Sequence, residues 1–375
     1  MKNEIKIGLI FLGVFLLAYF IDLNTAFFLE AISEALRMLN EYARLHILTC
    51  LVPALFIAGG ITNMISSSSV IRILSGSFGK FWAYLMASVS GSILAVCSCT
   101  VLPLFAGIYN SGAGIGPATT FLFSGPAINI LAMVLSFKAL GWQIGLARIV
   151  SAILLAVIIG IIMEKSFKRE DSERISKIVI PENGDFPVWK SALILTSIVF
   201  VLIFATWNIQ AGEAINSIKW WLVGGFTLLT LIFSILFLNK KRFYGWMDQT
   251  WTLTKQILPL LFFGVLISGF IFKIIPQEWI QNAVGGNSIL SNLAASVVGA
   301  FMYFATLTEV PIVENLMKSG MGNGPALSLL LAGPALSLPS MLVVYKVLGS
   351  KKAIVFFLLV IVLSALAGWI FGMIY

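Results

Sequence analysis

Apolar stretches long enough to cross a lipid bilayer follow one another along almost the whole chain. They lie at about residues 5–23, 45–66, 80–109, 116–139, 142–163, 188–207, 219–238, 252–275, 291–317, 325–347 and 353–374. Hydrophobic residues fill 59% of the 375 positions and charged residues 11%, whereas about 25% of an average soluble protein is charged. Because lipid cannot satisfy exposed backbone groups, these stretches are expected to be helices. The sequence predicts an all-α, polytopic integral membrane protein with about 10–11 transmembrane helices.

The polar segments between these stretches suggest how the chain is divided. Glu164–Lys190 is the only sizeable polar loop, and the positive-inside rule places it in the cytoplasm together with the basic run Asn239–Phe243. No small-residue cleavage site follows Ile5–Ile21, so this stretch is interpreted as a first transmembrane helix. The expected parts are 1–44 (this helix and an amphipathic helix), 45–163 (first repeat), 164–190 (charged loop), 191–250 (linking helices) and 251–375 (second repeat).

The net charge of +8 does not indicate nucleic-acid binding. Lys and Arg occur mostly in short runs between apolar stretches, where they set the orientation of the helices and contact anionic lipid headgroups. The expected partners are therefore the lipid bilayer and a small-molecule substrate.

Two halves of the chain repeat one another. Pro103–Ala127 aligns without a gap with Pro311–Ala335, and 11 of the 25 positions, each paired with the one 208 residues later, are identical. This indicates two homologous membrane repeats. If six helices cross the membrane between the two copies, the repeats are parallel, and one re-entrant segment that does not cross would make them inverted.

Both copies contain a Gly-Pro helix break inside an apolar stretch. The stretch 116–139 is cut by such a break, and 80–109 is long for one straight span, so either could be a broken or re-entrant helix. Broken helices are tolerated at membrane depth where protein or a water-filled cavity satisfies the freed backbone, and matched breaks in two repeats point to a transporter binding site. The alternative is that the glycines only allow close helix packing. The candidate substrate-binding residues are Ser124, Gly125, Pro126, Asn129, Gly333, Pro334 and Ser337.

Two acidic residues, Glu309 and Glu314, flank Pro311 in another apolar stretch. Carboxylates inside the membrane are costly and usually face a cavity, a partner or a proton path. Glu309 and Glu314 are therefore candidates for ion or proton coupling. For Glu314 the alternative is a surface ion pair with Lys318.

Cys97 and Cys99, with Ser98 between them, precede Pro103. Thiolates bind soft metals and metalloids, but on a regular helix the two side chains would point apart, so a shared ligand requires an unwound segment. Plain packing is the alternative, and Cys50 is open to both interpretations. A different class of function, a membrane thiol–disulfide carrier with a thioredoxin-like partner, would use the same pair, although a Cys-x-Cys ring is strained.

The motifs "CSCTVLP" and "SGPAIN" in the first copy, with "TEVP" and "GPALSLLLAGPALSLPSM" in the second, resemble the ArsP-type permease family, which includes the YraQ-like permeases. The resemblance covers roughly residues 40 to 350 and implies an inner-membrane permease. The best-described members export trivalent organoarsenicals, with cysteines as candidate ligands. The resemblance carries over to Cys97, Cys99, Pro103, Ser124, Gly125, Pro126, Asn129, Glu309, Pro311, Gly333 and Pro334.

Together these features favour a secondary transporter over an enzyme. The sequence contains no Walker-type phosphate loop, so coupling is expected to come from an ion or proton gradient through Glu309. No cofactor is expected. The substrate is a soft or thiol-reactive solute such as an organoarsenical or, alternatively, a small thiol compound or another organic solute.

Overall fold

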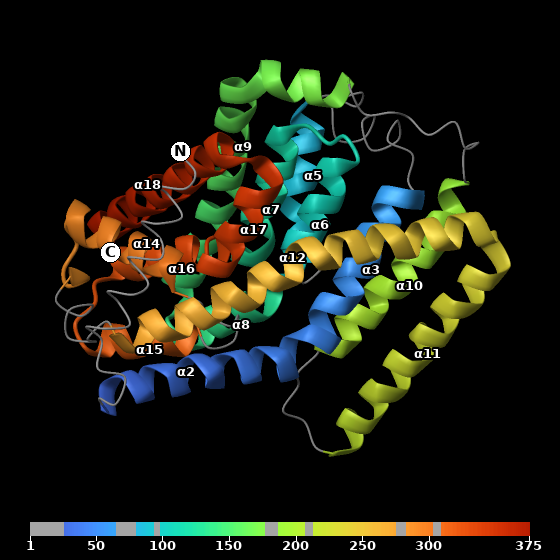
Figure 1. Cartoon of the computed structure of the whole chain (residues 1–375). Helices are drawn as coiled ribbons and strands as arrows, with labels where there is room; N and C mark the ends of the chain where they lie inside the picture. Colours follow the sequence, from blue (N-terminus) through green and yellow to red (C-terminus); the bar gives the residue numbers. More distant parts are fainter. Residues whose placement is uncertain are drawn as a thin grey trace, which may run out of the picture.

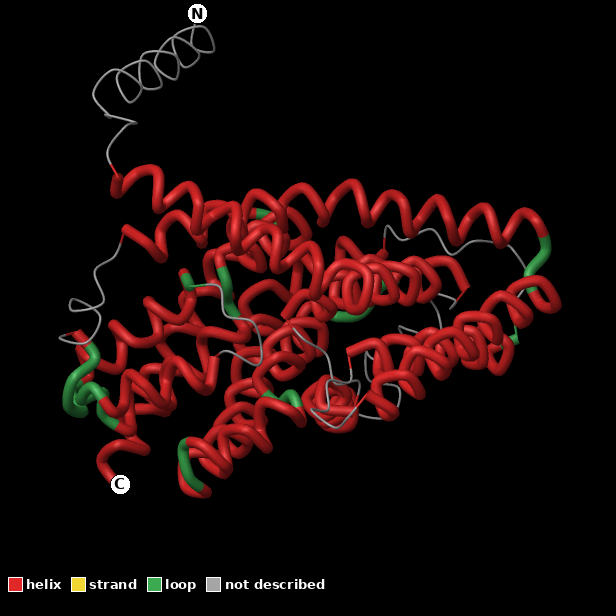
Figure 2. The backbone as a smooth tube through the Cα atoms, turned by 90° about the horizontal axis from the view of Figure 1, so that it is seen from below, coloured by secondary structure: helices red, strands yellow, loops and turns green. Residues whose placement is uncertain are grey.

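The computed structural model describes residues 26–64, 80–93, 98–176, 187–206, 213–274, 283–302 and 309–375. Within these ranges the regular elements are helices, apart from isolated bridges between Gly285–Gly286 and Met321 (Figure 2). The all-α prediction is confirmed. The helices are α2 (Ala26–Tyr42), η1 (Ala43–Leu51), α3 (Val52–Met64), α5 (Lys80–Ile93), α6 (Ser98–Asn110), α7 (Ile115–Ala127), α8 (Ile130–Ala139), α9 (Trp142–Ser176), α10 (Val188–Thr206), α11 (Glu213–Phe237), α12 (Lys240–Ile274), α14 (Ile289–Phe301), α15 (Glu309–Lys318), α16 (Asn323–Ala335), α17 (Leu338–Leu348) and α18 (Ser350–Ile374).

Several of these helices are long and apolar enough to span a bilayer. Five qualify among the described residues, or seven if each of two bent helix pairs counts as one span. The expected stretch 5–23 lies outside the described residues. The expected stretches 80–109 and 291–317 each contain two helices of 10 to 14 residues. A 13-residue helix is about 20 Å long, which is shorter than the roughly 30 Å hydrocarbon core. The chain is therefore a multi-pass membrane protein with some half-length helices.

Two long helices, α9 and α18, define the two ends of the bundle. They pack against each other, and Lys352 near the start of α18 lies 3.6 Å from Glu170 near the end of α9. The two helices therefore run antiparallel. We call the end at Glu164–Ser176 the charged end and the end at Trp369–Tyr375 the opposite end. In Figure 1 the last turns of α9 lie across the top of the molecule.

The bent pairs α7–α8 and α16–α17 run in opposite directions between these ends. α7 starts at the charged end, where the backbone N–H of Ile115 donates to Asp171 Oδ2 at 2.8 Å. α16 starts at the opposite end, where the side chain of Asn323 donates to the backbone oxygen of Tyr375 at 3.3 Å. Because α7 packs against α16, the two bent pairs meet in an antiparallel arrangement.

The half-length helices also enter from opposite ends. Tyr84, near the start of α5, donates to Glu164 Oε2 at 2.5 Å, and Tyr109, near the end of α6, lies under the Arg174 guanidinium, so both outer ends lie at the charged end. α14 begins beside Asn287, which donates to the carbonyl of Trp369, and Met321, just after α15, bridges Gly285–Gly286. These outer ends lie at the opposite end. Each pair thus enters and leaves the bundle on one side.

Glycines bring α7 close to α9 and α16 close to α18. A Cβ added to Gly116 would lie 3.0 Å from the carbonyl oxygen of Gly160, and one added to Gly324 would lie 2.7 Å from that of Gly368. The two glycine pairs are 208 residues apart in sequence. Only residues without a side chain allow backbones to approach this closely, which is how small residues drive helix packing in membranes.

The remaining helices lie along one side of this bundle. The long helix α12 runs diagonally past α2 and α3, and α10 and α11 form a pair at the far side from α14 and α16 (Figure 1). Only 6% of the spanning stretch of α11 is buried, so most of its apolar surface faces outward from the bundle.

Candidate functional site

The two Gly-Pro motifs lie at the bends of the buried helix pairs. α7 and α8 meet at 47°, and α16 and α17 meet at 51°. The residue after each helix leaves helical geometry: Ile128 has φ −112° and ψ 36°, and Leu336 has φ −127° and ψ 112°. Pro126 and Pro334 lack an N–H and so cannot continue the helical hydrogen-bond ladder. Both bends occur where the sequence predicts breaks.

All of the predicted residues at the two bends are buried. Ser124 donates to the carbonyl of Ala87 on α5 at 3.2 Å, which is a packing contact between helices. Asn129 lies in the first bend and is 4% exposed. At the second bend Ser337 caps α17, and its hydroxyl is 2.7 Å from that of Ser340. Gly333 lies against α14. A Cβ added to Gly299 on that helix would be 3.2 Å from the backbone nitrogen of Gly333.

A buried ion pair joins the first bend to the second half of the chain. Arg148 Nη2 on α9 lies 3.2 Å from Glu309 Oε1, at the first residue of α15, and the exposed fractions of the two side chains are 0% and 2%. The same guanidinium donates through Nε to the carbonyl of Ala127 at 3.1 Å and through Nη1 to the hydroxyl of Ser136 on α8 at 3.1 Å. Arg148 therefore contacts both sides of the α7–α8 bend and Glu309 at once.

Arg148 and Glu309 depend on each other to neutralise their buried charges. α15 packs mainly against α8 and α16; α16 carries no charged residue, and the only one on α8, Lys138, is exposed. Removing one partner of a buried pair leaves an uncompensated charge, which typically costs about 3–5 kcal/mol. Neither Arg148 Nη2 nor Glu309 Oε1 makes a hydrogen bond of good geometry in the described structure, although they lie at ion-pair distance. Both atoms thus keep hydrogen-bonding capacity that a ligand or a proton could use.

Arg148 is the site residue that the sequence analysis missed. Its signal was a single arginine in the apolar stretch 142–163, because an intramembrane charge is a functional-site hypothesis by default. Glu309, in contrast, is one of the predicted residues.

The remaining predicted residues are Glu314, Pro103 and the cysteines with Ser98. Glu314 forms a 2.6 Å ion pair with Lys318 one turn later, at the surface. Pro103 is buried inside α6. Cys97 lies outside the described residues. Ser98 and Cys99 are the first two residues of α6, but the structure does not describe their side chains. Cys50 is buried in η1, and in the described ranges no three His, Cys, Asp or Glu residues cluster as a metal site.

These features define a class of protein: a multi-pass, all-helical membrane protein whose interior holds two bent helix pairs and a buried ion pair. Comparison with known families is more specific. The model of the ArsP_1 family, described as a predicted permease, matches residues 32–373, and the chain belongs to this family.

The relatives support this assignment. The UPF0718 protein MJ0584 of Methanocaldococcus jannaschii is 42% identical over 360 residues, which cover 93% of this chain and 98% of the relative. The UPF0718 protein YraQ of Escherichia coli is 26% identical over 259 residues, which cover 68% of this chain and 58% of the relative. No solved structure matches the chain. The family indicates a transporter rather than an enzyme.

Proposed function

We propose that the protein is a secondary transporter of the inner membrane that exports a small soft or thiol-reactive solute, such as a trivalent organoarsenical. The site is formed by the two bent pairs α7–α8 and α16–α17. The observation that carries the proposal is that these buried, bent pairs contact each other in antiparallel directions, with the Arg148–Glu309 pair at the first bend.

The two halves act as inverted repeats in this proposal. The bends, the half-length helix pairs and the glycine crossings each occur twice, 208 residues apart and in opposite directions. Inverted repeats give a transporter two related states, because each half can adopt the conformation of the other and open the central site to the other side. The backbone groups freed at each bend can face the substrate.

Glu309 is the coupling carboxylate, and Arg148 is its partner. A proton on Glu309 removes its attraction for Arg148, so proton binding changes the contacts that Arg148 makes across the α7–α8 bend. Glu314, which pairs with Lys318 at the surface, has no such link to the bend. We therefore assign coupling to Glu309 alone.

The nature of the substrate rests on Cys97 and Cys99, through the resemblance to organoarsenical permeases. Thiolates are the soft ligands that trivalent arsenic prefers. A small thiol compound or another organic solute is the alternative substrate.

The test is flux of a trivalent methylated arsenical into liposomes that contain the purified protein, driven by a pH gradient. We expect flux by the wild type, loss of flux in Cys97→Ser/Cys99→Ser, and loss of pH dependence in Glu309→Gln. Glu314→Gln is the matched control because it changes the same group on the same helix, and its flux should stay within about twofold of wild type, as expected for a surface pair.

Each result has a distinct meaning. Flux that survives the double cysteine change removes the thiols from the mechanism. If the wild type carries no arsenical, but Glu309-dependent flux of a small thiol is seen, the alternative substrate is supported. Redox cycling of the cysteine pair with thioredoxin, in the absence of any solute flux, would contradict the transporter proposal.

A further inference from the structure

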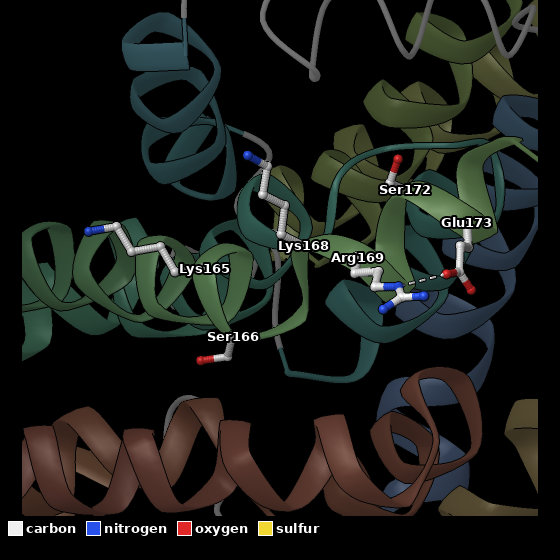
Figure 3. Close-up of a pocket in the computed structure, with 6 residues that line it drawn as sticks. All are labelled: Lys165, Ser166, Lys168, Arg169, Ser172 and Glu173. Carbon is white, nitrogen blue, oxygen red and sulfur yellow. Dashed lines mark hydrogen bonds and ion pairs between the residues drawn. The ribbon is translucent and has the colours of Figure 1, made fainter.

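The charged end of the bundle contains a surface hollow that the transport proposal does not use. It measures about 530 Å³ and is lined by Lys165, Ser166, Lys168, Arg169, Ser172 and Glu173 (Figure 3). All six residues come from α9, on both sides of Phe167, where φ −122° and ψ 21° interrupt the helix. The hollow therefore forms where α9 stops crossing the bundle and turns along its charged end.

The charges in this hollow are unbalanced. Arg169 Nε lies 3.3 Å from Glu173 Oε1, so these two side chains neutralise each other. No ion pair joins Lys165 or Lys168 to any other described residue, and both are exposed. In Figure 3 both ammonium groups extend away from the Arg169–Glu173 pair. Two ammonium groups without an ion-pair partner among the described residues, on one short segment, suit an anionic group such as a phosphate.

An apolar stripe leads along α9 directly to these lysines. Its side chains are 38–57% exposed and recur every three or four residues, at Leu146, Val150, Leu154, Ile158 and Ile161. This spacing puts them on one helix face, and Lys165 continues the same face one turn after Ile161. The section from Leu154 to Lys165 rises about 16 Å, close to half of a bilayer hydrocarbon core.

From this juxtaposition we infer that the hollow binds an anionic phospholipid. Its phosphate lies between Lys165 and Lys168, and its acyl chains lie along Leu154, Ile158 and Ile161. Charge complementarity selects an anionic headgroup, and the stripe selects a lipid over a soluble anion. The opposite, buried face of α9 carries Arg148, so the lipid and the ion pair occupy different faces of one helix.

The test is native mass spectrometry of the full-length protein titrated with phosphatidylglycerol or phosphatidylcholine. The expected result is one preferred phosphatidylglycerol bound to the wild type. Because each basic residue near an anionic surface contributes about fivefold in affinity, Lys165→Gln/Lys168→Gln should weaken this binding roughly 25-fold. The control Lys240→Gln/Lys241→Gln removes the same charge at the start of α12 and should bind phosphatidylglycerol like the wild type.

Three outcomes would overturn the inference: equal binding of the two lipids, equal weakening by both double variants, or displacement of phosphatidylglycerol by millimolar glycerol phosphate. The last result would make the site one for soluble phosphate. The changed lysines are exposed, so unchanged melting temperatures are expected and exclude misfolding as the cause of lost binding.

Discussion

At the scale of single residues, Arg148 and Glu309 combine burial with opposite charge. Such pairs are poor sources of stability because the loss of hydration offsets much of their attraction. Arg148 makes three different contacts, to Glu309, to the Ala127 carbonyl and to Ser136. Replacing both charges of such a pair with apolar side chains often costs little stability, so stability alone gives no reason to keep the pair.

A double-mutant cycle separates these roles. Arg148→Met should lower the free energy of unfolding by about 3–5 kcal/mol because it leaves Glu309 as an unpaired buried charge. Arg148→Met/Glu309→Leu should recover most of this loss, since both charges are then absent. Thermal unfolding in detergent measures stability, and liposome flux measures function.

The two measurements should diverge in the double variant. We expect its melting temperature to return towards that of the wild type while its proton-driven flux stays lost. Recovered flux would mean that the pair is structural and that the proton binds elsewhere.

The sequence alone predicts some of the site residues but not how they pair. The helix breaks at Pro126 and Pro334 are predictable from the sequence, because proline cannot donate the hydrogen bond that continues a helix. Glu309 stood out as an acid in an apolar stretch. Its partner is 161 positions earlier in the chain, and no local pattern specifies which of the distant helices will face it.

At the scale of helices, the two glycine crossings should be equally intolerant of added volume. Gly116→Ala and Gly324→Ala each place a methyl group against a facing backbone carbonyl. Overpacking of this kind costs about 1–3 kcal/mol, so both variants should melt at lower temperature.

Gly224→Ala provides the matched control for these variants. Gly224 lies in α11 with open space around the position of an added Cβ. Alanine is the better helix former by about 1 kcal/mol, so this variant should be as stable as the wild type or slightly more stable. Similar losses in all three variants would show that the crossings are not close-packed.

The end of α9 holds the turn between α6 and α7. Asp171 accepts from the first N–H of α7, while Arg174 donates to the carbonyls of Tyr109 and Ala113 and lies 3.7 Å from the centre of the Tyr109 ring. Asp171→Ala removes the cap and should cost about 0.5–2 kcal/mol. Hydrogen exchange should speed up at residues 110–118, with the α15–α16 turn unchanged as the internal reference.

Helix positions were more predictable than helix directions. Apolar length locates most segments, and the stretch 80–109 is long for one straight span, which allows a broken or re-entrant helix. Whether it crosses or turns back depends on contacts such as those of Tyr84 with Glu164 and of Arg174 with Tyr109, which lie 65 to 80 residues apart in sequence. Hydropathy contains no information about these contacts.

At the scale of the whole molecule, the antiparallel arrangement can be tested by labelling. Asn110, the last residue of α6 at the charged end, and Ser319, in the turn after α15 at the opposite end, are both exposed. With Cys50, Cys97 and Cys99 changed to Ser, Asn110→Cys and Ser319→Cys should react with a membrane-impermeant thiol reagent from opposite faces. The basic residues at the charged end predict that Asn110 faces the cytoplasm.

Labelling of both positions from one face would contradict the antiparallel arrangement. It would instead support parallel repeats, the other topology that the sequence left open. The repeat itself was predictable because Gly and Pro recur at fixed spacing, but its orientation was not, since it depends on whether a single segment crosses the bilayer.

The glycine crossings also bear on how such a chain could arise. Each crossing is built within one half: Gly116 meets Gly160, and Gly324 meets Gly368. A half-length chain would therefore contain its own crossing. If such a chain inserted into the membrane in both orientations, two copies would pair face to face, and gene fusion would later fix one copy in each orientation. The counterparts of Arg148 and Glu309, 208 positions away, are Phe356 and Val101. The ion pair would then date from after the fusion, when the two copies became free to differ.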